Sequence, residues 1–202
     1  MSADEDRATR LDVSVGSNIS KLQAAFLSDD PTARATLAQL RLAVDEEPGL
    51  NPRVWERVME TIPERYVGRM DAPSDGEWAT HLALTFYAVH QQGNTRPVHV
   101  RDVSFGTAAG TLVRKRPSTK GRYDAALMAT TFRQQRYHLR GLIGLLKAEG
   151  IALDYGRFAN DLFLLQKDEF RSGVIRKWGR DFYRGYSRVP DEEPESTVSS
   201  VN

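Results

Sequence analysis

The sequence lacks cysteine and any apolar run long enough to cross a membrane. None of its 202 residues is a cysteine, which excludes disulfides, thiol catalysis and thiolate metal sites. A membrane-spanning helix needs about 18 or more consecutive apolar residues, and no such run occurs. The N-terminus, MSADEDRATR, is acidic where a secretory signal peptide would be basic. We therefore expect a soluble, cytoplasmic protein without membrane contacts.

Motifs of the common enzyme classes are also missing. The sequence has no Rossmann or Walker glycine loop and no HExxH metal motif. His81 and His90 are nine residues apart, too far for a metal pair on one helix, so we expect structural or surface histidines. Ser104 and Ser118 have no partner histidine and aspartate at an informative spacing. The sequence thus predicts no catalytic residue, no metal ligand and no cofactor.

Convincing strand patterns are absent, whereas helical periodicity with capping signals recurs along the chain. Proline follows a capping residue at Asp30-Pro31 and at Asn51-Pro52, and Ser74 with Glu77 has the spacing of a capping box. Further caps are expected at Asp102 or Ser104, at Thr130 or Thr131, and at Asp154. The predicted helices lie near residues 32–44, 53–62, 78–92, 105–116, 120–130, 132–149, 155–167 and 169–185.

These elements predict an all-α helical bundle of about eight helices. The folded domain is expected over residues 17–186, and a junction near 94–104 would separate two helical subdomains. Gly106 and Gly110 suggest a close crossing of two helices. The polar segment 1–16 and the acidic tail 187–202 are expected to be disordered.

Charge is distributed unevenly along the chain, although the formal net charge is only +1. Residues 1–95 contain nine Lys/Arg and fifteen Asp/Glu, whereas residues 96–188 contain nineteen Lys/Arg and eight Asp/Glu. The net charge of +11 in the second half favours a polyanionic partner such as nucleic acid. An uneven but merely solvated surface is the alternative.

Two stretches concentrate this positive charge. In the helix predicted over 132–149, the basic residues recur at spacings of three, four and seven and therefore share one stripe, which consists of Arg133, Arg136, Arg140 and Lys147. No acidic residue occurs in 125–148, which argues against an ordinary solvated face of mixed sign. The segment VRKRPSTKGR (113–122) has five basic residues and no acid, and a helical hairpin would bring it alongside the stripe. A solvated loop is its alternative. The basic candidates from these two stretches are Arg114, Arg116, Lys120, Arg122, Arg133, Arg136 and Arg140.

The last predicted helix interleaves further basic residues with aromatic ones. Trp178, Phe182 and Tyr183 would be able to stack on bases. At helical spacing, however, we favour core positions for them.

Several phrases occur together in an order that resembles the CasB family, the small subunit of the type I-E CRISPR Cascade surveillance complex. They are LTFYAVHQQG (84–93), VSFGTAAGTL (103–112), KGRYDAAL (120–127), YHLRGLIGLLKAEGIALDY (137–155) and DLFLL…WGRDFYR (161–184). With the phrase AQLRLA (38–43), the resemblance covers about residues 38–184.

The resemblance implies an all-α fold without enzymatic activity. It implies partners in the backbone and large subunits of Cascade, CRISPR RNA, target DNA including the displaced strand, and a second copy of the chain placed head to tail. A basic face would then stabilise the guide–target duplex and the displaced strand of the R-loop, where modest contacts can tip a near-balanced exchange.

Matching the family phrases position by position adds one candidate and shows several departures, among them Tyr155 at the end of an LDW phrase and Thr107 where a basic residue often follows the glycine. Arg41 matches the first basic position of an N-terminal LRR-like phrase, and Leu42 replaces the second. Leu139-Arg140-Gly141 matches another LRR phrase, again without the second arginine. All these basic residues are expected to contact the nucleic-acid backbone rather than read sequence.

Two other classes of protein remain as alternatives. A free-standing helical transcription regulator would need a basic recognition helix, and the N-terminal half, where such regulators usually carry it, is acidic. A helical enzyme acting on RNA would need a metal site or an acid–base cluster, which the sequence does not contain.

Overall fold

The regular structure of the protein is helical. A computed structural model describes residues 10–187, and within that range it has nine α-helices, two short 3-10 turns and one isolated parallel bridge between His99 and Leu153. The α-helices are α2 (Leu11–Leu27), α3 (Pro31–Leu42), α4 (Pro52–Thr61), α5 (Asp75–Gln91), α6 (Phe105–Lys115), α7 (Lys120–Met128), α8 (Phe132–Ala148), α9 (Tyr155–Leu165) and α10 (Asp168–Ser187), and the 3-10 turns are η1 (Glu64–Tyr66) and η2 (Pro117–Thr119). The predicted all-α class and all eight predicted helices are confirmed.

Side-chain caps fix where several of these helices begin. At four N-termini a side-chain oxygen accepts a hydrogen bond from the backbone N–H three residues later, and the capping residues are Asp30, Ser104, Thr131 and Asp154. Ser74 and Glu77 form both halves of a capping box at the start of α5. These bonds satisfy N–H groups that have no partner inside the helix.

The start of the folded part differs from the prediction. The segment expected to be disordered up to residue 16 is helical from Leu11 onwards, because α2 begins there. Leu11, Val15 and Ile19 recur every four residues and are fully buried, so a single apolar stripe anchors an otherwise polar segment. Residues 1–9 and 188–202, which include the rest of the predicted disordered ends, lie outside the described residues.

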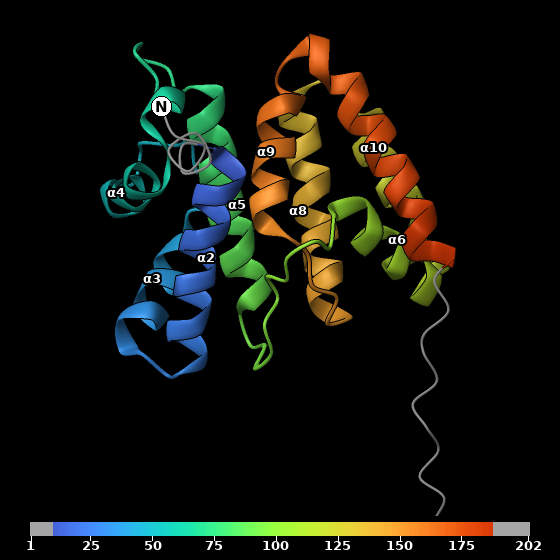
Figure 1. Cartoon of the computed structure of the whole chain (residues 1–202), viewed down its shortest axis with the longest axis horizontal. Coiled ribbons are helices and arrows are strands. Elements are labelled where there is room, and N and C mark those ends of the chain that lie inside the picture. The colour runs from blue at the N-terminus through green and yellow to red at the C-terminus, as the bar shows by residue number, and fades with distance from the viewer. Residues whose placement is uncertain (1–9, 188–202) are drawn as a thin grey trace, which may run out of the picture.

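Helix α5 lies at the centre of the molecule (Figure 1). It packs against α2, α3 and α4 on one side and against α8 and α9 on the other. One hydrophobic core therefore runs from Leu11 in α2 to Phe182 in α10, and the segment 94–104 connects helices of that shared core. In the described part of the chain, no helix is both long and apolar enough for a membrane span.

The predicted close helix crossing lies between α6 and α10. A Cβ atom on Gly106 would come 2.4 Å from the carbonyl oxygen of Trp178, and one on Gly110 would come 2.1 Å from that of Phe182. Gly185 of α10 faces the backbone of Thr107 in the same way, at 2.1 Å. The two helix backbones approach so closely that any side chain at these three positions would push them apart. This crossing fixes α6, and with it the basic segment that follows α6.

Candidate nucleic-acid interface

Helix α8 presents the predicted arginine stripe. Its buried side consists of Gln135, Leu139, Leu142, Ile143 and Leu146, and Thr131 caps its N-terminus. Because residues three and four apart share a face, Arg133, Arg136 and Arg140 line the edge of this buried side. Arg133 and Arg140 are exposed and Arg136 is half-buried. The sequence prediction of one stripe on the surface of α8 therefore holds in the structure.

Arg136 is held in place by an aromatic ring. Its guanidinium carbon lies 4.1 Å from the centroid of the Trp78 ring on α5. Partial burial lowers the pKa of Arg136, the neighbouring Arg133 lowers it further, and Glu47 and Asp45 oppose the shift. Arginine stays charged at neutral pH despite such shifts. The contact with Trp78 thus fixes a positive charge in a defined position at the surface.

Arg140 is held by the chain that follows α3. Its guanidinium donates to both carboxylate oxygens of Asp45, three residues after the last residue of α3. On the last turn of α3, Arg41 lies close enough to Lys147 of α8 to lower the pKa of that lysine, after the larger effect of partial burial. The structure therefore brings Arg41, Arg133, Arg136 and Arg140 to one side of α8, and we call these four residues the arginine flank.

A small cavity opens within the arginine flank. Its volume is about 160 Å³, and its lining combines three arginines with apolar side chains of α5 and one exposed tyrosine. The lining residues are Val44, Asp45, Leu82, Phe86, Arg133, Arg136, Tyr137 and Arg140.

The basic segment 113–122 lies elsewhere. Lys115 donates to the carbonyl oxygen of Glu149 at 3.4 Å, and Arg116 lies 3.4 Å from the carboxylate of the same residue. Glu149 follows Arg133 by sixteen residues, which places it about 160° around the helix axis from Arg133. The expectation that this segment lies alongside the stripe is therefore wrong: it meets the far side of α8 at the C-terminal end.

The remaining predicted residues of the segment 113–122 are Lys120, Arg122 and Arg114. Lys120 is paired with Asp124 one turn later on α7, and its ammonium group lies 5.6 Å from the centroid of the Phe182 ring. Arg122 is exposed and Arg114 is half-buried. We call Arg114, Lys115, Arg116, Lys120 and Arg122 the second basic group, which is separated from the arginine flank by the width of α8.

The aromatic side chains of α10 divide between core and surface. Trp178 is fully buried and Phe182 is also in the core, as predicted. The indole N–H of Trp178 donates to Asp161 at 2.7 Å, and Lys177 pairs with the other oxygen of that carboxylate. Burial raises the pKa of Asp161, and Lys177 opposes the shift. Tyr183, by contrast, is 68% exposed, so the core interpretation fails for this one residue.

The two histidines singled out in the sequence are structural. The ring of His81 bonds through Nε2 to the carbonyl oxygen of Ala43, and His90 bonds through Nδ1 to the hydroxyl of Tyr155. Burial lowers the pKa of each to about 4, so both are neutral at pH 7. Across residues 10–187 no three His, Cys, Asp or Glu side chains are grouped so that they would hold a metal ion.

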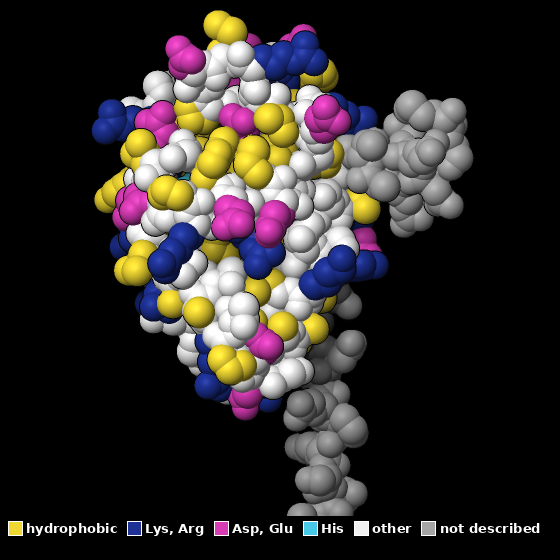
Figure 2. All heavy atoms as spheres, turned by 90° about the vertical axis from the view of Figure 1, so that its left-hand side faces the viewer, with side chains coloured by type: hydrophobic (Ala, Val, Ile, Leu, Met, Phe, Trp, Pro, Cys, Tyr) yellow, Lys and Arg dark blue, Asp and Glu magenta, His cyan; other side chains and the backbone are white. Residues whose placement is uncertain are grey.

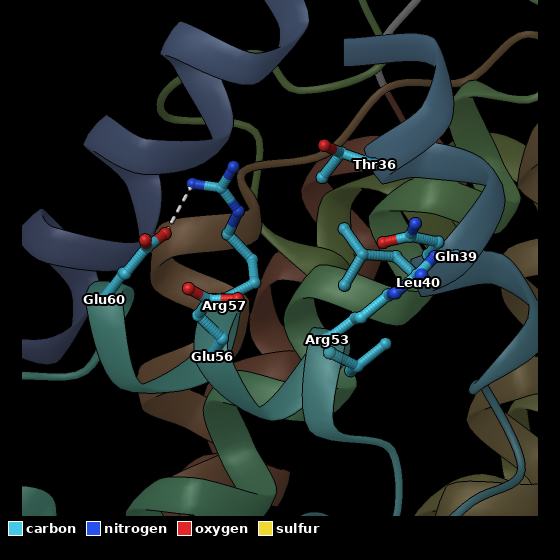
Figure 3. A pocket seen from close by; sticks show the side chains of 8 residues that line it. Thr36, Gln39, Leu40, Arg53, Glu56, Arg57 and Glu60 are labelled. Atoms are coloured by element: carbon cyan, nitrogen blue, oxygen red, sulfur yellow. Dashed lines mark ion pairs between the residues drawn. The ribbon is translucent and has the colours of Figure 1, made fainter. Parts of the chain in front are cut away.

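The surface between α3 and α4 has a different charge pattern. Figure 2 shows the side that carries α3 and α4, where acidic and basic side chains are interspersed around hydrophobic ones. A cavity of about 330 Å³ lies between these two helices, and on its α4 side Arg57 is paired with Glu60 at 2.9 Å (Figure 3). Arg53 and Glu56 add one further charge of each sign. This side offers no continuous basic surface.

Comparison with known proteins agrees with the resemblance seen in the sequence. A family model of CRISPR-associated protein Cse2 matches residues 36–183. The chain belongs to the Cse2 family. This family, also called CasB, provides a structural subunit of type I-E Cascade complexes. A search of curated proteins by sequence found no match.

Solved structures of Cse2 proteins share the fold. The crystal structure of CasB from Thermobifida fusca has a TM-score of 0.68 and 28% identity, over 86% of this chain and 97% of that one. A Cse2-family protein from Thermus thermophilus has a TM-score of 0.63 and 21% identity, over 91% and 99%. CasB from M. ruber has a TM-score of 0.54 and 23% identity, over 74% and 84%. The latter two likenesses extend to the fold alone.

Two of the departures from the family phrases, Leu42 and Gly141, lie at the surface. Leu42, which stands where the phrase has a basic residue, is 75% exposed at the end of α3. Gly141, in the place of the second arginine of the other phrase, is also exposed, and a Cβ atom there would meet nothing within 4 Å. This chain therefore has two fewer positive charges beside Arg41 and Arg140 than the family phrases would give.

Three residues of the site were not predicted from the sequence. Trp78 and Asp45 hold Arg136 and Arg140, but they are far from them in the chain, and no local pattern connects them. Tyr137 had a detectable signal, because it lies between basic residues in RQQRYHLR (133–140). The signal for Tyr137 is an aromatic residue in the middle of a segment that is otherwise mostly basic and polar.

Proposed function

We propose that this chain is the small subunit of a type I-E Cascade complex and that it stabilises the R-loop through its arginine flank. The observation that carries the proposal is the set of three arginines along one side of α8, in a chain of the Cse2 family and in a stretch, 125–148, without any acidic residue. Each phosphate contact releases condensed counterions and so adds affinity at every sequence. Such contacts can tip the near-balanced exchange of a DNA duplex for a guide–target duplex.

In this proposal the chain has no catalytic activity and acts in the cytoplasm, with two copies placed head to tail beside the backbone and large subunits. Its ligands are the guide–target duplex, formed by CRISPR RNA and target DNA, and the displaced strand. The second basic group would make a separate contact with nucleic acid. A duplex or strand held by both groups would have to cross α8. The free-standing transcription regulator is disfavoured by membership of the Cse2 family.

Co-expression with a tagged backbone subunit and a CRISPR RNA tests the proposal. Size-exclusion chromatography should show this chain in a ribonucleoprotein peak. Elution of the chain alone, while the complex forms without it, would contradict the assignment. Replacing the three α8 arginines of the flank, Arg133, Arg136 and Arg140, with alanine should leave co-elution unchanged, because in the proposal these residues contact nucleic acid and not other subunits.

A further inference from the structure

One exposed aromatic side chain stands among the arginines of α8. Tyr137 is 76% exposed, more than any other aromatic residue between residues 10 and 187. A single exposed aromatic residue needs no explanation on its own. Tyr137, however, lines the 160 Å³ cavity together with Arg133, Arg136 and Arg140, and the lining also includes the core residues Leu82 and Phe86. A planar apolar group thus lies directly beside three arginine side chains.

The surroundings leave the ring accessible. Its one ring neighbour in the described part of the chain is His138, whose ring centroid is 5.6 Å away at a steep angle of 74°. Side chains on a helix lean toward its N-terminus, so the residue that would cover Tyr137 is the one a turn later. That residue is Gly141, which has no side chain and nothing within 4 Å of its Cβ position.

One neighbouring cation is already positioned. Arg136 is fixed on the Trp78 ring, so a ligand would not have to order it. Holding binding groups in place before the ligand arrives lowers the entropic cost of association. Arg133, one turn before Tyr137, forms no ion pair with any residue in 10–187 and is exposed.

We infer that Tyr137 is a stacking platform for an unpaired nucleobase, with Arg133 and Arg140 contacting the phosphates on either side of it. Aromatic side chains beside cations are the usual means of binding single strands without reading their sequence, because every base has a flat π-face. The bases of a duplex are stacked and paired and cannot reach the ring. The inference rests on the proposed function only for the source of the strand. An unpaired base could come from the displaced DNA strand or from an unpaired part of the guide RNA.

The test uses the isolated full-length chain and short single-stranded oligonucleotides that carry one 2-aminopurine, in a DNA series and an RNA series at low salt. Stacking on an aromatic ring changes the fluorescence of 2-aminopurine directly. Tyr137→Ala should abolish that change and weaken binding at least fivefold, whereas Tyr137→Phe should retain both. Tyr183→Ala is the matched control, since Tyr183 is an equally accessible tyrosine on α10, and it should behave as wild type.

An abasic oligonucleotide separates stacking from charge. The wild-type chain should bind it as weakly as Tyr137→Ala binds the normal strand, and Tyr137→Ala should cause no further loss. An equal loss on normal and abasic strands, or an unchanged fluorescence signal in the alanine variant, would overturn the inference, as would the absence of any binding by the wild type. Stronger binding in one series identifies DNA or RNA as the source.

The same experiment separates this inference from the proposed function. If the Arg133, Arg136 and Arg140 triple variant loses affinity while Tyr137→Ala does not, the arginine flank binds nucleic acid and the stacking inference falls. If stacking is observed but the chain fails to enter a guide complex, the inference survives and the proposed function falls.

Discussion

The arginines of the flank differ in their contacts within the protein, and this difference determines how much each should contribute to nucleic-acid binding. Arg136 stacks on Trp78 and Arg140 is paired with Asp45, whereas Arg133 is exposed and, within residues 10–187, has no ion-pair partner. A surface ion pair with N···O contact is worth only about 0.2–1 kcal/mol, so a phosphate can compete with Asp45 for Arg140. Arg133 has no such competitor.

Replacing Arg133 with alanine should therefore weaken binding of any nucleic acid to a similar degree, irrespective of sequence. Loss of one phosphate contact should reduce the slope of log K against log salt concentration by about 0.7–0.9. Electrophoretic shift titrations over a salt range of roughly 50 to 200 mM would measure this change. Arg53→Ala is the control, because Arg53 is an exposed arginine of α4 that does not belong to the arginine flank and has acidic residues beside it. A slope unchanged by Arg133→Ala would remove this residue from the interface.

Replacing Asp45 with asparagine should have the opposite effect. The change frees Arg140 from a carboxylate and removes a negative charge from the arginine flank, so affinity for nucleic acid should rise. The free energy of unfolding should fall by no more than about 1 kcal/mol, since the pair is exposed. Binding titrations and urea denaturation measure the two quantities. Glu60→Gln, which breaks an ion pair on α4, is the matched control and should leave affinity unchanged. Weaker binding by Asp45→Asn would mean that Asp45 positions Arg140 rather than competing for it.

At the scale of single elements, local signals in the sequence predicted most of the fold. Helix caps and helical periodicity are patterns of residues three or four apart, so they can be read from the sequence. The caps at Asp30, Ser74 and Asp154 and helix α8 are found where they were predicted. Helix α2 was missed because its start carries no capping signal: Arg10 precedes it, and no side chain caps its N-terminus.

The candidate site was predicted only in part, and for a related reason. Spacing along α8 determines that its arginines share a face, but not what lies opposite them. The pairing of Arg140 with Asp45 joins residues 95 positions apart. The docking of residues 115 and 116 on Glu149 likewise depends on how α6 packs in three dimensions. Contacts of this kind depend on the tertiary arrangement and leave no local pattern.

The crossing of α6 and α10 gives a stability prediction. Gly110→Ala should destabilise the protein by more than about 2 kcal/mol, because its Cβ would lie 2.1 Å from a backbone oxygen that cannot move without separating the helices. Gly141→Ala on α8 should instead stabilise it by up to about 1 kcal/mol, since that site is open and alanine favours helix. Thermal and urea denaturation of the two variants would measure both changes in stability. A neutral Gly110→Ala would show that the crossing is looser than described.

The buried histidines of α5 predict how stability depends on pH. Burial lowers the pKa of His81 and of His90 to about 4, against about 6.5 in an unfolded chain. Their contribution is fully present above about pH 6.5 and is lost as the pH falls toward 4, because only the unfolded chain then takes up the protons. Each histidine should contribute at most about 1.4 kcal/mol per pH unit to the loss of folding stability.

Urea denaturation at a series of pH values between about 7.5 and 4.5 would measure this loss. His90→Asn should lower stability at neutral pH and make the pH dependence shallower, because one of the buried histidines that take up a proton only on unfolding is then gone. A variant that retains the full wild-type slope would show that His90 is not responsible.

At the scale of the whole molecule, basic side chains form two groups on a protein that is nearly neutral overall. The arginine flank and the second basic group lie on different sides of α8, while the side carrying α3 and α4 has charges of both signs (Figure 2). A molecule of this kind can hold a polyanion on one side and leave its mixed sides for protein neighbours.

The most direct test of the central claim is the affinity of a reconstituted guide complex for its target DNA when Arg133, Arg136 and Arg140 are all alanine. The account predicts that the variant folds and assembles like the wild type. It also predicts that R-loop affinity falls by roughly tenfold or more for every target, and that the salt slope decreases by about 2–3. Preference for matched over mismatched targets should stay the same, because these residues contact the backbone. Unchanged R-loop affinity in a fully assembled complex would contradict the claim that the arginine flank of α8 holds nucleic acid.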